Sequence, residues 1–269
     1  MPPLSISRAW DDTKAIIARE VHLLAALVLA LVVLPQVVIS IVGAPVGPQT
    51  TPLSQLVYIA SVLLGFVAQI ALTRLAIAPP IRLADAIVVG FSRVLPVFLV
   101  LVVLMFLLGI AAIFLAMLLS GAGVAVLPVS GQAPPPALLG LLIVLMALAM
   151  AIFQLVFPIA GAETGNPIRL FVRSWQLGHR RYLRLLAFFI TVLIALGVIG
   201  VFSQVGVGSV IMLLFGRPTP GSVAALFLGL ISGSIEAAFT VVFAVMLARI
   251  YVQLARPAHA EAGVPSSGI

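Results

Sequence analysis

The sequence lacks cysteine and contains few charged residues. Without cysteine the chain has no disulfide bonds, no thiolate metal ligands and no cysteine nucleophile. Only 8% of the 269 residues are charged and 63% are hydrophobic, whereas about 25% of the residues of soluble domains are charged. No stretch between the apolar runs is long enough for a separate soluble domain. The composition therefore predicts one polytopic membrane domain.

Acidic residues are scarce, since seven Asp and Glu stand against 14 Lys and Arg and leave a net charge of +7. Such a balance is typical of proteins that bind nucleic acid, but these basic residues are divided among several short connections. They do not gather on one soluble face. We expect anionic lipid headgroups as the counter-charge, and no nucleic acid partner.

Apolar runs of about 20 residues or more, enough to cross a bilayer, recur along the whole chain. We expect an all-α membrane protein with six transmembrane helices in three hairpins, each hairpin preceded by a cytoplasmic interfacial amphipathic helix. Residues 1–250 form this domain, and the polar residues 251–269 are expected to be a flexible cytoplasmic tail. The expected spans are 21–42, 53–78, 94–119, 137–162, 185–215 and 222–250.

The distribution of basic residues predicts the orientation. Thirteen of the 14 lie in the amino-terminal segment, in the connections between spans 2 and 3 and spans 4 and 5, or at the carboxyl end. Arg217 is the one on the opposite side. Because Lys and Arg concentrate on the cytoplasmic side, we expect a multi-pass protein of the bacterial cytoplasmic (inner) membrane with both termini in the cytoplasm.

The most basic stretch is 166–184, between spans 4 and 5. Asn166 and Pro167 are the expected N-cap and first residue of its helix. Helical periodicity gathers arginines within an arc of about 60° and sets aromatic rings opposite, a pattern typical of a helix in a membrane interface. The arginines are Arg169, Arg173, Arg180 and Arg184, and the rings are Phe171, Trp175 and Tyr182.

Paired arginines suggest an internal repeat. Arg8 and Arg19, Arg82 and Arg93, and Arg173 and Arg184 are each eleven residues apart, close to three helical turns or about 16 Å. We interpret the chain as three units, 5–78, 81–162 and 166–250, although coincidence among basic residues in short loops is the alternative. The residues expected to contact lipid headgroups or a partner protein are Arg8, Trp10, Arg19, Arg82, Arg93, Arg169, Arg173, Trp175, Arg180, Arg181 and Arg184.

Glu163, followed by the sequence Arg-Ser-Trp-x-Leu at 173–177 before a span, carries a family resemblance. The layout and these residues are similar to bacterial six-span families of unknown function, related to the membrane domain found beside some glycerophosphodiester phosphodiesterases. The resemblance implies a helical bundle in the cytoplasmic membrane and no established activity. The phosphodiesterase catalytic domain itself is absent from this sequence.

Glu236 is the one acidic residue deep within an expected span. A charged group at that depth costs about 2.5–3.5 kcal/mol on insertion scales, so such residues are candidates for function. It shares a helix face with small residues, and we expect a matching stripe in the fifth span to bring Gln204 to a similar depth. An intramembrane polar site of Glu236 and Gln204, with Gln69 and Gln154, is one interpretation. A protonated Glu236 that only bonds a neighbouring helix is the other.

No constellation for catalysis, metal binding or a cofactor is recognisable. The three histidines, His22, His179 and His259, lack ligand spacing, and no histidine lies deep in a span to activate the serines near Glu236. Our first hypothesis is a non-enzymatic protein whose basic helices contact anionic lipid or a cytoplasmic partner, with a role in membrane organisation or envelope maintenance. The second is a proton- or cation-coupled transporter or channel that uses Glu236. An enzyme acting on lipid through Glu236 or Glu163 is the third.

Overall fold

The computed structural model describes residues 5–43, 51–77, 81–122 and 136–260. In these ranges every regular element is a helix and no strand occurs. Six helical stretches are long and apolar enough to cross a membrane, which confirms the all-α prediction at that level. They are Ile6–Val42, Pro52–Ile77, Leu83–Gly121, Leu138–Ala162, Tyr182–Phe215 and Val223–Ala255.

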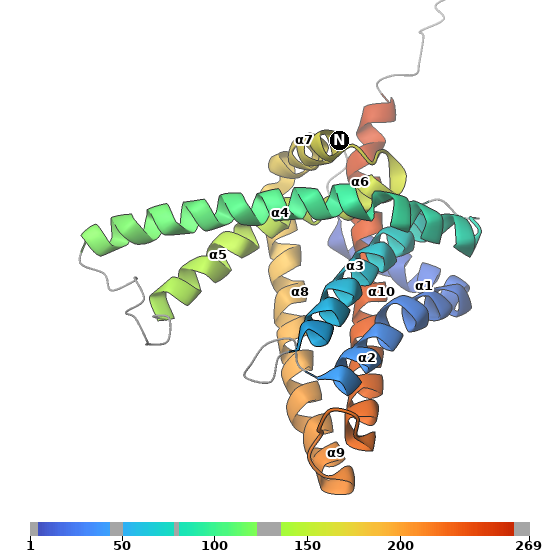
Figure 1. Cartoon of the computed structure of the whole chain (residues 1–269). Coiled ribbons are helices and arrows are strands. Elements are labelled where there is room, and N and C mark those ends of the chain that lie inside the picture. The colour runs from blue at the N-terminus through green and yellow to red at the C-terminus, as the bar shows by residue number, and fades with distance from the viewer. Residues whose placement is uncertain (1–4, 44–50, 78–80, 123–135, 261–269) are drawn as a thin grey trace, which may run out of the picture.

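Several of these stretches consist of shorter helices joined by irregular turns (Figure 1). The first contains α1 (Ile6–Val28), the π-helical turn η1 (Leu29–Val33) and α2 (Leu34–Val42). The second and third are α3 (Pro52–Ile77) and α4 (Leu83–Gly121). The fourth contains α5 (Pro136–Phe153) and α6 (Val156–Ala162), and is followed by α7 (Pro167–Gly178) and the 3₁₀ turn η2 (His179–Arg181). The last two are α8 (Tyr182–Phe202) with η3 (Ser203–Val207) and α9 (Gly208–Phe215), and α10 (Val223–Ala260).

Two of the irregular turns lie beside prolines. In η1 the Leu34 amide donates to the carbonyl of Leu29, five residues back, just before Pro35. Pro158 has no amide hydrogen for the carbonyl of residue 154, and α5 and α6 are separated at residues 154–155. Pro96, by contrast, lies inside the uninterrupted helix α4. The fourth span is therefore a broken helix, the first is a continuous helix with a π-helical turn inside it, and the third is uninterrupted.

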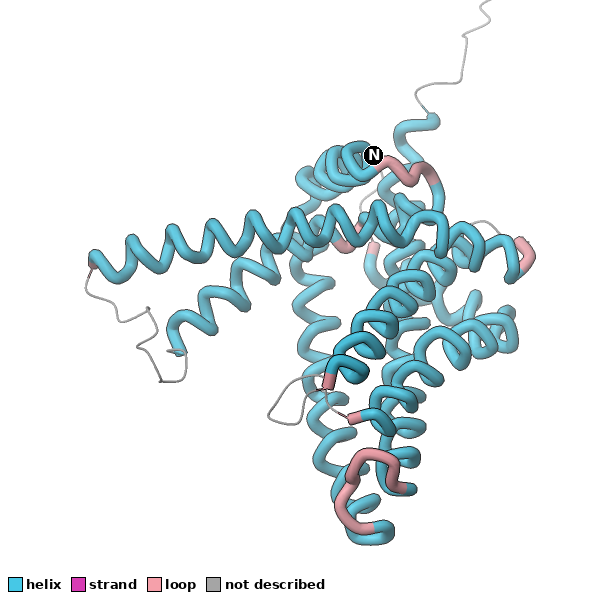
Figure 2. Tube along the Cα trace, viewed as in Figure 1, coloured by secondary structure: helices cyan, strands magenta, loops and turns pink. Residues whose placement is uncertain are grey.

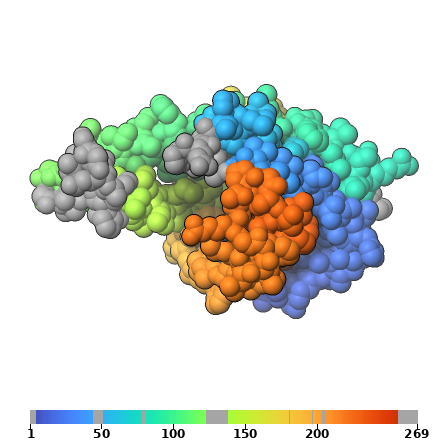
Figure 3. Space-filling view, turned by 60° about the horizontal axis from the view of Figure 1, so that its bottom comes forward, coloured from blue at the N-terminus to red at the C-terminus, as the bar shows by residue number. Residues whose placement is uncertain are grey.

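The helix α10 is the centre of the packing. It lies along α1, η1 and α2 on one side and along α3 on another. Residues 70–72 of α3 and residues 247–248 of α10 are fully buried. Figure 3 shows α2, α3 and the beginning of α10 in contact on one face, and Figure 2 shows the far ends of α4 and α5 projecting to the left of the other helices. The polar residues of α3 and α10 are thereby brought to a common surface with α2.

The three predicted units differ at the entry to their spans. In the first, the backbone of Glu20 leaves the helical conformation, with φ −112° and ψ 20°. In the third, η2 separates α7 from α8. In the second, residues 83–121 form one continuous helix of 39 residues, so the interfacial helix expected before the third span is an extension of that span. The threefold repeat stays a prediction.

The fifth and sixth spans contact each other less extensively than a tight hairpin requires. The helix α10 meets the fifth span mainly through η3 and α9, while its longest contacts are with the first span. The rings of Phe188 on α8 and Phe243 on α10 are stacked with centroids 6.2 Å apart. The three-hairpin arrangement therefore also stays a prediction.

The sixth helix extends beyond the expected boundary at residue 250, since α10 runs to Ala260. Tyr251 and Leu254 are buried. Gln253 bonds the backbone of Ser5, because its side chain accepts from the Ser5 amide at 3.1 Å and donates to the Ser5 carbonyl at 3.3 Å. These contacts hold residues 251–255 in the fold, where we expected a tail. Residues 261–269 lie outside the described part.

Candidate functional site

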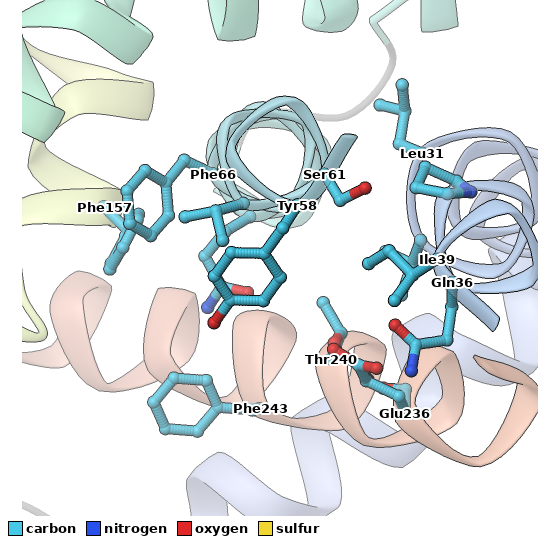
Figure 4. Close-up of a pocket in the computed structure, with 15 residues that line it drawn as sticks. Leu31, Gln36, Ile39, Tyr58, Ser61, Phe66, Phe157, Glu236, Thr240 and Phe243 are labelled. Carbon is cyan, nitrogen blue, oxygen red and sulfur yellow. Dashed lines mark hydrogen bonds between the residues drawn. The ribbon is translucent and has the colours of Figure 1, made fainter. Parts of the chain in front are cut away.

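A cavity of about 400 Å³ lies among the first, second and sixth spans, with one residue contributed by the fourth. Figure 4 shows Gln36 and Ile39, Tyr58 and Ser61, and Glu236 and Thr240 around it. Glu236 and Gln69, two members of the predicted polar site, both line this cavity. The remaining lining residues are Leu31, Val32, Pro35, Val62, Gly65, Phe66, Phe157 and Phe243.

Close packing of α10 on α2 positions Glu236 beside the first span. A Cβ built on Gly229 would lie 2.8 Å from the Cβ of Ser40 and 2.9 Å from the Cα of Val37. A Cβ on Gly233 would lie 3.1 Å from the Cβ of Gln36. Glycine alone permits this approach. Because Glu236 follows Gly233 by about one turn, its side chain lies beside Gln36 at the wall of the cavity (Figure 4).

The small residues of α10 therefore have a different partner from the one predicted. Gly197, Gly200 and Gly208 of the fifth span have open space around their Cα atoms, with nothing within 4 Å of an added Cβ. The first span supplies the tight contact because its residues at 33, 36, 37 and 40 face the two glycines of α10. Sequence spacing identified the stripe but not the helix packed against it.

Two hydroxyl groups of the cavity lining are left as hydrogen-bond acceptors. The hydroxyl of Ser61 donates to the Val57 carbonyl at 2.8 Å, and that of Thr240 donates to the Glu236 carbonyl at 2.9 Å. Both hydroxyls have used their hydrogen, so only their oxygen lone pairs remain for a ligand. Together with the Glu236 carboxylate, they give this part of the cavity an electronegative lining.

Gln69 is a second unusual group in the cavity. Its side chain is only 7% exposed, and its Nε2 is buried without a hydrogen-bond partner in the described part of the chain. Leaving such a group unsatisfied costs about 1–3 kcal/mol. Gln69 is therefore an energetically costly group at the wall of the cavity.

The other two predicted members of the polar site lie apart from these residues or cannot be placed. Gln154 is buried at the break between α5 and α6, where its Nε2 donates to the Ala151 carbonyl at 3.2 Å. It does not line the cavity. The turn η3 lies beside α10, but the side chain of Gln204 is outside the described residues.

Sequence reasoning missed Gln36, Tyr58 and Ser61. Gln36 directly follows Pro35 in an otherwise apolar span, and the combination of a polar residue with a helix-breaking residue was the available signal. Tyr58 precedes Gln69 by eleven residues, which is close to three helical turns, and Ser61 precedes it by eight, which still places both on one broad face. That spacing gave no indication of which helix would face them.

A second polar cluster joins five helices at the end of α6. Arg93 of α4 donates to the Ala160 carbonyl, and Arg74 of α3 donates to the Gly161 carbonyl at 3.0 Å. Both arginines thus satisfy carbonyls at a helix C-terminus, which lack partners within the helix. Arg93 was predicted to contact lipid, but the structure uses it for this internal contact.

Glu163 completes this cluster. Its Oε2 lies 3.2 Å from Nε of Arg173 on α7, and its Oε1 accepts a hydrogen bond of 2.6 Å from the hydroxyl of Tyr251 on α10. One carboxylate therefore connects the turn after α6 to two other helices. Arg173, another predicted lipid contact, is engaged here.

The helix α7 presents three different sides. Asn166 caps it as predicted, since its side chain accepts from the amides of residues 168 and 169. The inner side carries Ser174, whose hydroxyl donates to the Ile152 carbonyl at 2.8 Å. Ile168 and Trp175 are 73% and 53% exposed and share an outer strip. Arg169 is exposed on the side next to this strip.

The remaining predicted lipid contacts are mostly at the surface. Arg8, Trp10, Arg82 and Arg184 are exposed, while Arg181 is partly buried. Arg19 pairs with Glu20 at 2.9 Å. The side chain of Arg180 lies outside the described residues.

The expected aromatic side of this basic stretch is divided. Only Trp175 faces outward, because Phe171 packs against Phe153 with ring centroids 4.8 Å apart. The hydroxyl of Tyr182 donates to the Leu148 carbonyl at 3.1 Å. Two of the three rings that we expected to contact acyl chains therefore contact other parts of the protein instead.

Comparison with protein-family models, with curated proteins and with solved structures gives no match for this chain. The candidate functions therefore rest on the geometry of the chain itself.

Proposed function

We propose that this chain is a non-enzymatic multi-pass membrane protein that acts as a proton- or cation-coupled carrier or channel through Glu236. One observation carries the proposal: Glu236 opens on a cavity of about 400 Å³ shared by three spans. A charged acid inside a membrane span raises the free energy of insertion. Such acids, when they face a cavity, mark ion and substrate pathways.

The arrangement of Glu236 argues against a role in packing alone. A glutamic acid that holds helices together would donate or accept a hydrogen bond across the helix contact. Within the described residues, the hydrogen bond at Glu236 is the one that Thr240 makes to its backbone carbonyl. The close contact between α10 and α2 is made instead by Gly229 and Gly233.

Ion flux in proteoliposomes tests this function. Vesicles containing the purified chain and a pH-sensitive or alkali-cation-sensitive dye are subjected to a gradient of that cation. We expect flux above that of protein-free vesicles, and a loss of this flux in Glu236→Gln. Ser234→Ala, which is on the same helix but does not line the cavity, should behave as the unsubstituted chain. Equal flux in Glu236→Gln, or no protein-dependent flux of any tested cation, contradicts the proposal.

Contact with anionic lipid or a cytoplasmic partner is the second candidate function, supported by the outer surface of α7. Exposed apolar side chains at Ile168 and Trp175 lie next to the exposed guanidinium of Arg169. A cavity of about 390 Å³ beside α7 is lined by Arg169, Arg173 and Gln176 together with Glu163. A helix with adjoining apolar and cationic strips fits the boundary between acyl chains and headgroups.

Tryptophan quenching tests this second function because the chain has only two tryptophans. In Trp10→Phe, the fluorescence reports on Trp175. Brominated phosphatidylglycerol should quench it more strongly than brominated phosphatidylcholine, and Arg169→Gln should reduce the difference. Equal quenching by the two lipids in both proteins would rule out selection of anionic lipid at α7.

The proposal includes a location in the bacterial cytoplasmic membrane with both termini cytoplasmic. The concentration of basic residues on one side of the expected spans supports this orientation. The resemblance to bacterial six-span families supports the location. A single cysteine introduced at Arg217 should react with an impermeant thiol reagent from outside intact cells, whereas one at Arg82 should not.

A further inference from the structure

We propose that the ligand of the Glu236 cavity is an organic ammonium ion with an apolar, preferably aromatic, body. This inference rests on the proposed function, because it names the class of cation that the site takes. It follows from the charge, the hydrogen-bonding state and the shape of the cavity lining.

The charged end of the ligand is indicated by the acceptors. Glu236 is the acidic residue among the described residues that line the cavity, and no Lys, Arg or His is among them. Ser61 and Thr240 offer oxygen lone pairs, because their hydrogens are donated to backbone carbonyls. A carboxylate and two acceptor-only hydroxyls favour a positively charged group and disfavour an anion.

The apolar end is indicated by the aromatic rings. Tyr58, Phe66, Phe157 and Phe243 line the same cavity as Glu236. The rings of Phe66 and Phe157 have centroids 5.7 Å apart, and Figure 4 shows the ring of Tyr58 extending from α3 toward α10. Aromatic faces attract ammonium groups and also pack against hydrocarbon.

The size of the cavity favours a molecule over a bare ion. A volume of about 400 Å³ lies within the usual range of small-molecule sites, about 300–1,000 Å³. In the described ranges no three His, Asp or Glu residues are grouped closely enough to hold a metal ion.

Because the chain has no cysteine, a thiol introduced by substitution is the only thiol that can react in the test. Ser61→Cys introduces a single thiol into the cavity with almost no change of shape and leaves Glu236 in place. Its reaction rate is measured in membrane vesicles with two methanethiosulfonates of similar size, one carrying a trimethylammonium group and the other a sulfonate. The cationic reagent should react faster than the anionic one. Glu236→Gln in the same background should reduce this difference in rate.

Protection by a ligand gives the second readout. Benzyltrimethylammonium at ten times its Kd should slow the reaction of Ser61→Cys about tenfold. Glu236→Gln should weaken its binding at least about tenfold, or about 1.4 kcal/mol. Tetramethylammonium, which has no apolar body, should protect only at higher concentration. Tyr58→Leu, which removes one ring, should weaken the binding of benzyltrimethylammonium about fivefold.

The outcomes separate this inference from the function on which it rests. If Ser61→Cys reacts readily but benzyltrimethylammonium gives no protection, the organic ammonium is wrong while a water-accessible cation site stands. Equal protection by sodium chloride points to an inorganic cation and overturns the inference. If Ser61→Cys reacts with neither reagent, no accessible cavity exists and the proposed function fails as well. Equilibrium dialysis of benzyltrimethylammonium against the unsubstituted chain in nanodiscs checks the result without a variant.

Discussion

Replacing Gly229 by alanine should weaken the contact between α10 and α2 that forms one wall of the cavity. The added methyl group would lie 2.8 Å from the Cβ and Oγ of Ser40 and 2.9 Å from the Cα of Val37, whereas ordinary contact begins at 3.4 Å. Ser40 cannot turn its Cβ away, and the second obstacle is backbone. The two helices must therefore separate by about 0.6 Å at this level.

The magnitude follows from this displacement. A gap of about 0.5–1 Å removes a quarter to a half of the dispersion attraction between facing atoms. Overpacking of this kind costs about 1–3 kcal/mol. Alanine regains up to about 1 kcal/mol through its higher helix propensity. We expect Gly229→Ala to destabilise the fold by about 1–2 kcal/mol.

The matched control is Gly200→Ala on α8, where nothing lies within 4 Å of the new methyl group. It gains helix propensity without a clash and should be neutral or slightly stabilising. Thermal unfolding in detergent micelles compares the two variants. The Tm is expected to shift by about 2–4 °C for each kcal/mol of destabilisation. A Gly229→Ala chain as stable as Gly200→Ala would refute the close packing of α10 on α2.

The polar contacts at and near α7 give three further predictions. Glu163→Gln loses the ion pair with Arg173 and weakens the acceptor of the Tyr251 hydroxyl, so it should lower the free energy of unfolding by about 1–3 kcal/mol. A double-mutant cycle with Tyr251→Phe should show a coupling energy of at least about 0.5 kcal/mol, and strict additivity would argue against the contact. Asn166→Ala removes the N-cap of α7 and should cost about 1 kcal/mol, whereas Asn166→Asp should keep most of the stability. Arg169→Gln should weaken binding of anionic lipid by about 1 kcal/mol, measured by lipid retention in native mass spectrometry, and unchanged retention would contradict a headgroup contact.

The six apolar helical spans were predictable from the sequence because the physical signals are local. Apolar runs of sufficient length predict spans, and the Asn166-Pro167 pair predicts the start of α7. The continuous helix α4 was not predictable, since Arg82 and Arg93 resemble their counterparts in the other units. No local signal distinguishes a helix that breaks at Glu20 from one that continues through Arg93.

The candidate site was predictable only in part because it depends on which helices pack together. Glu236 stood out through its charge, and Gln69 is one of two buried amide side chains in the described residues. That Gln36 and Tyr58 share a cavity with Glu236 follows from the packing of α10 against α2 and α3. Spacing within one helix shows which residues share a face but not which helix that face meets. Arg93 and Arg173 illustrate the same limit, because their internal partners come from distant positions in the chain.

The most direct measurement is the accessibility of position 236 compared with that of position 234. Glu236→Cys and Ser234→Cys each carry a single thiol, and the two positions are separated by about 200° around α10. Both residues are exposed, but Glu236 lines the cavity and Ser234 does not. In vesicles, a membrane-impermeant thiol reagent should modify Glu236→Cys and leave Ser234→Cys unmodified until detergent is added. Equal protection of both thiols from the reagent would contradict a water-accessible cavity at Glu236.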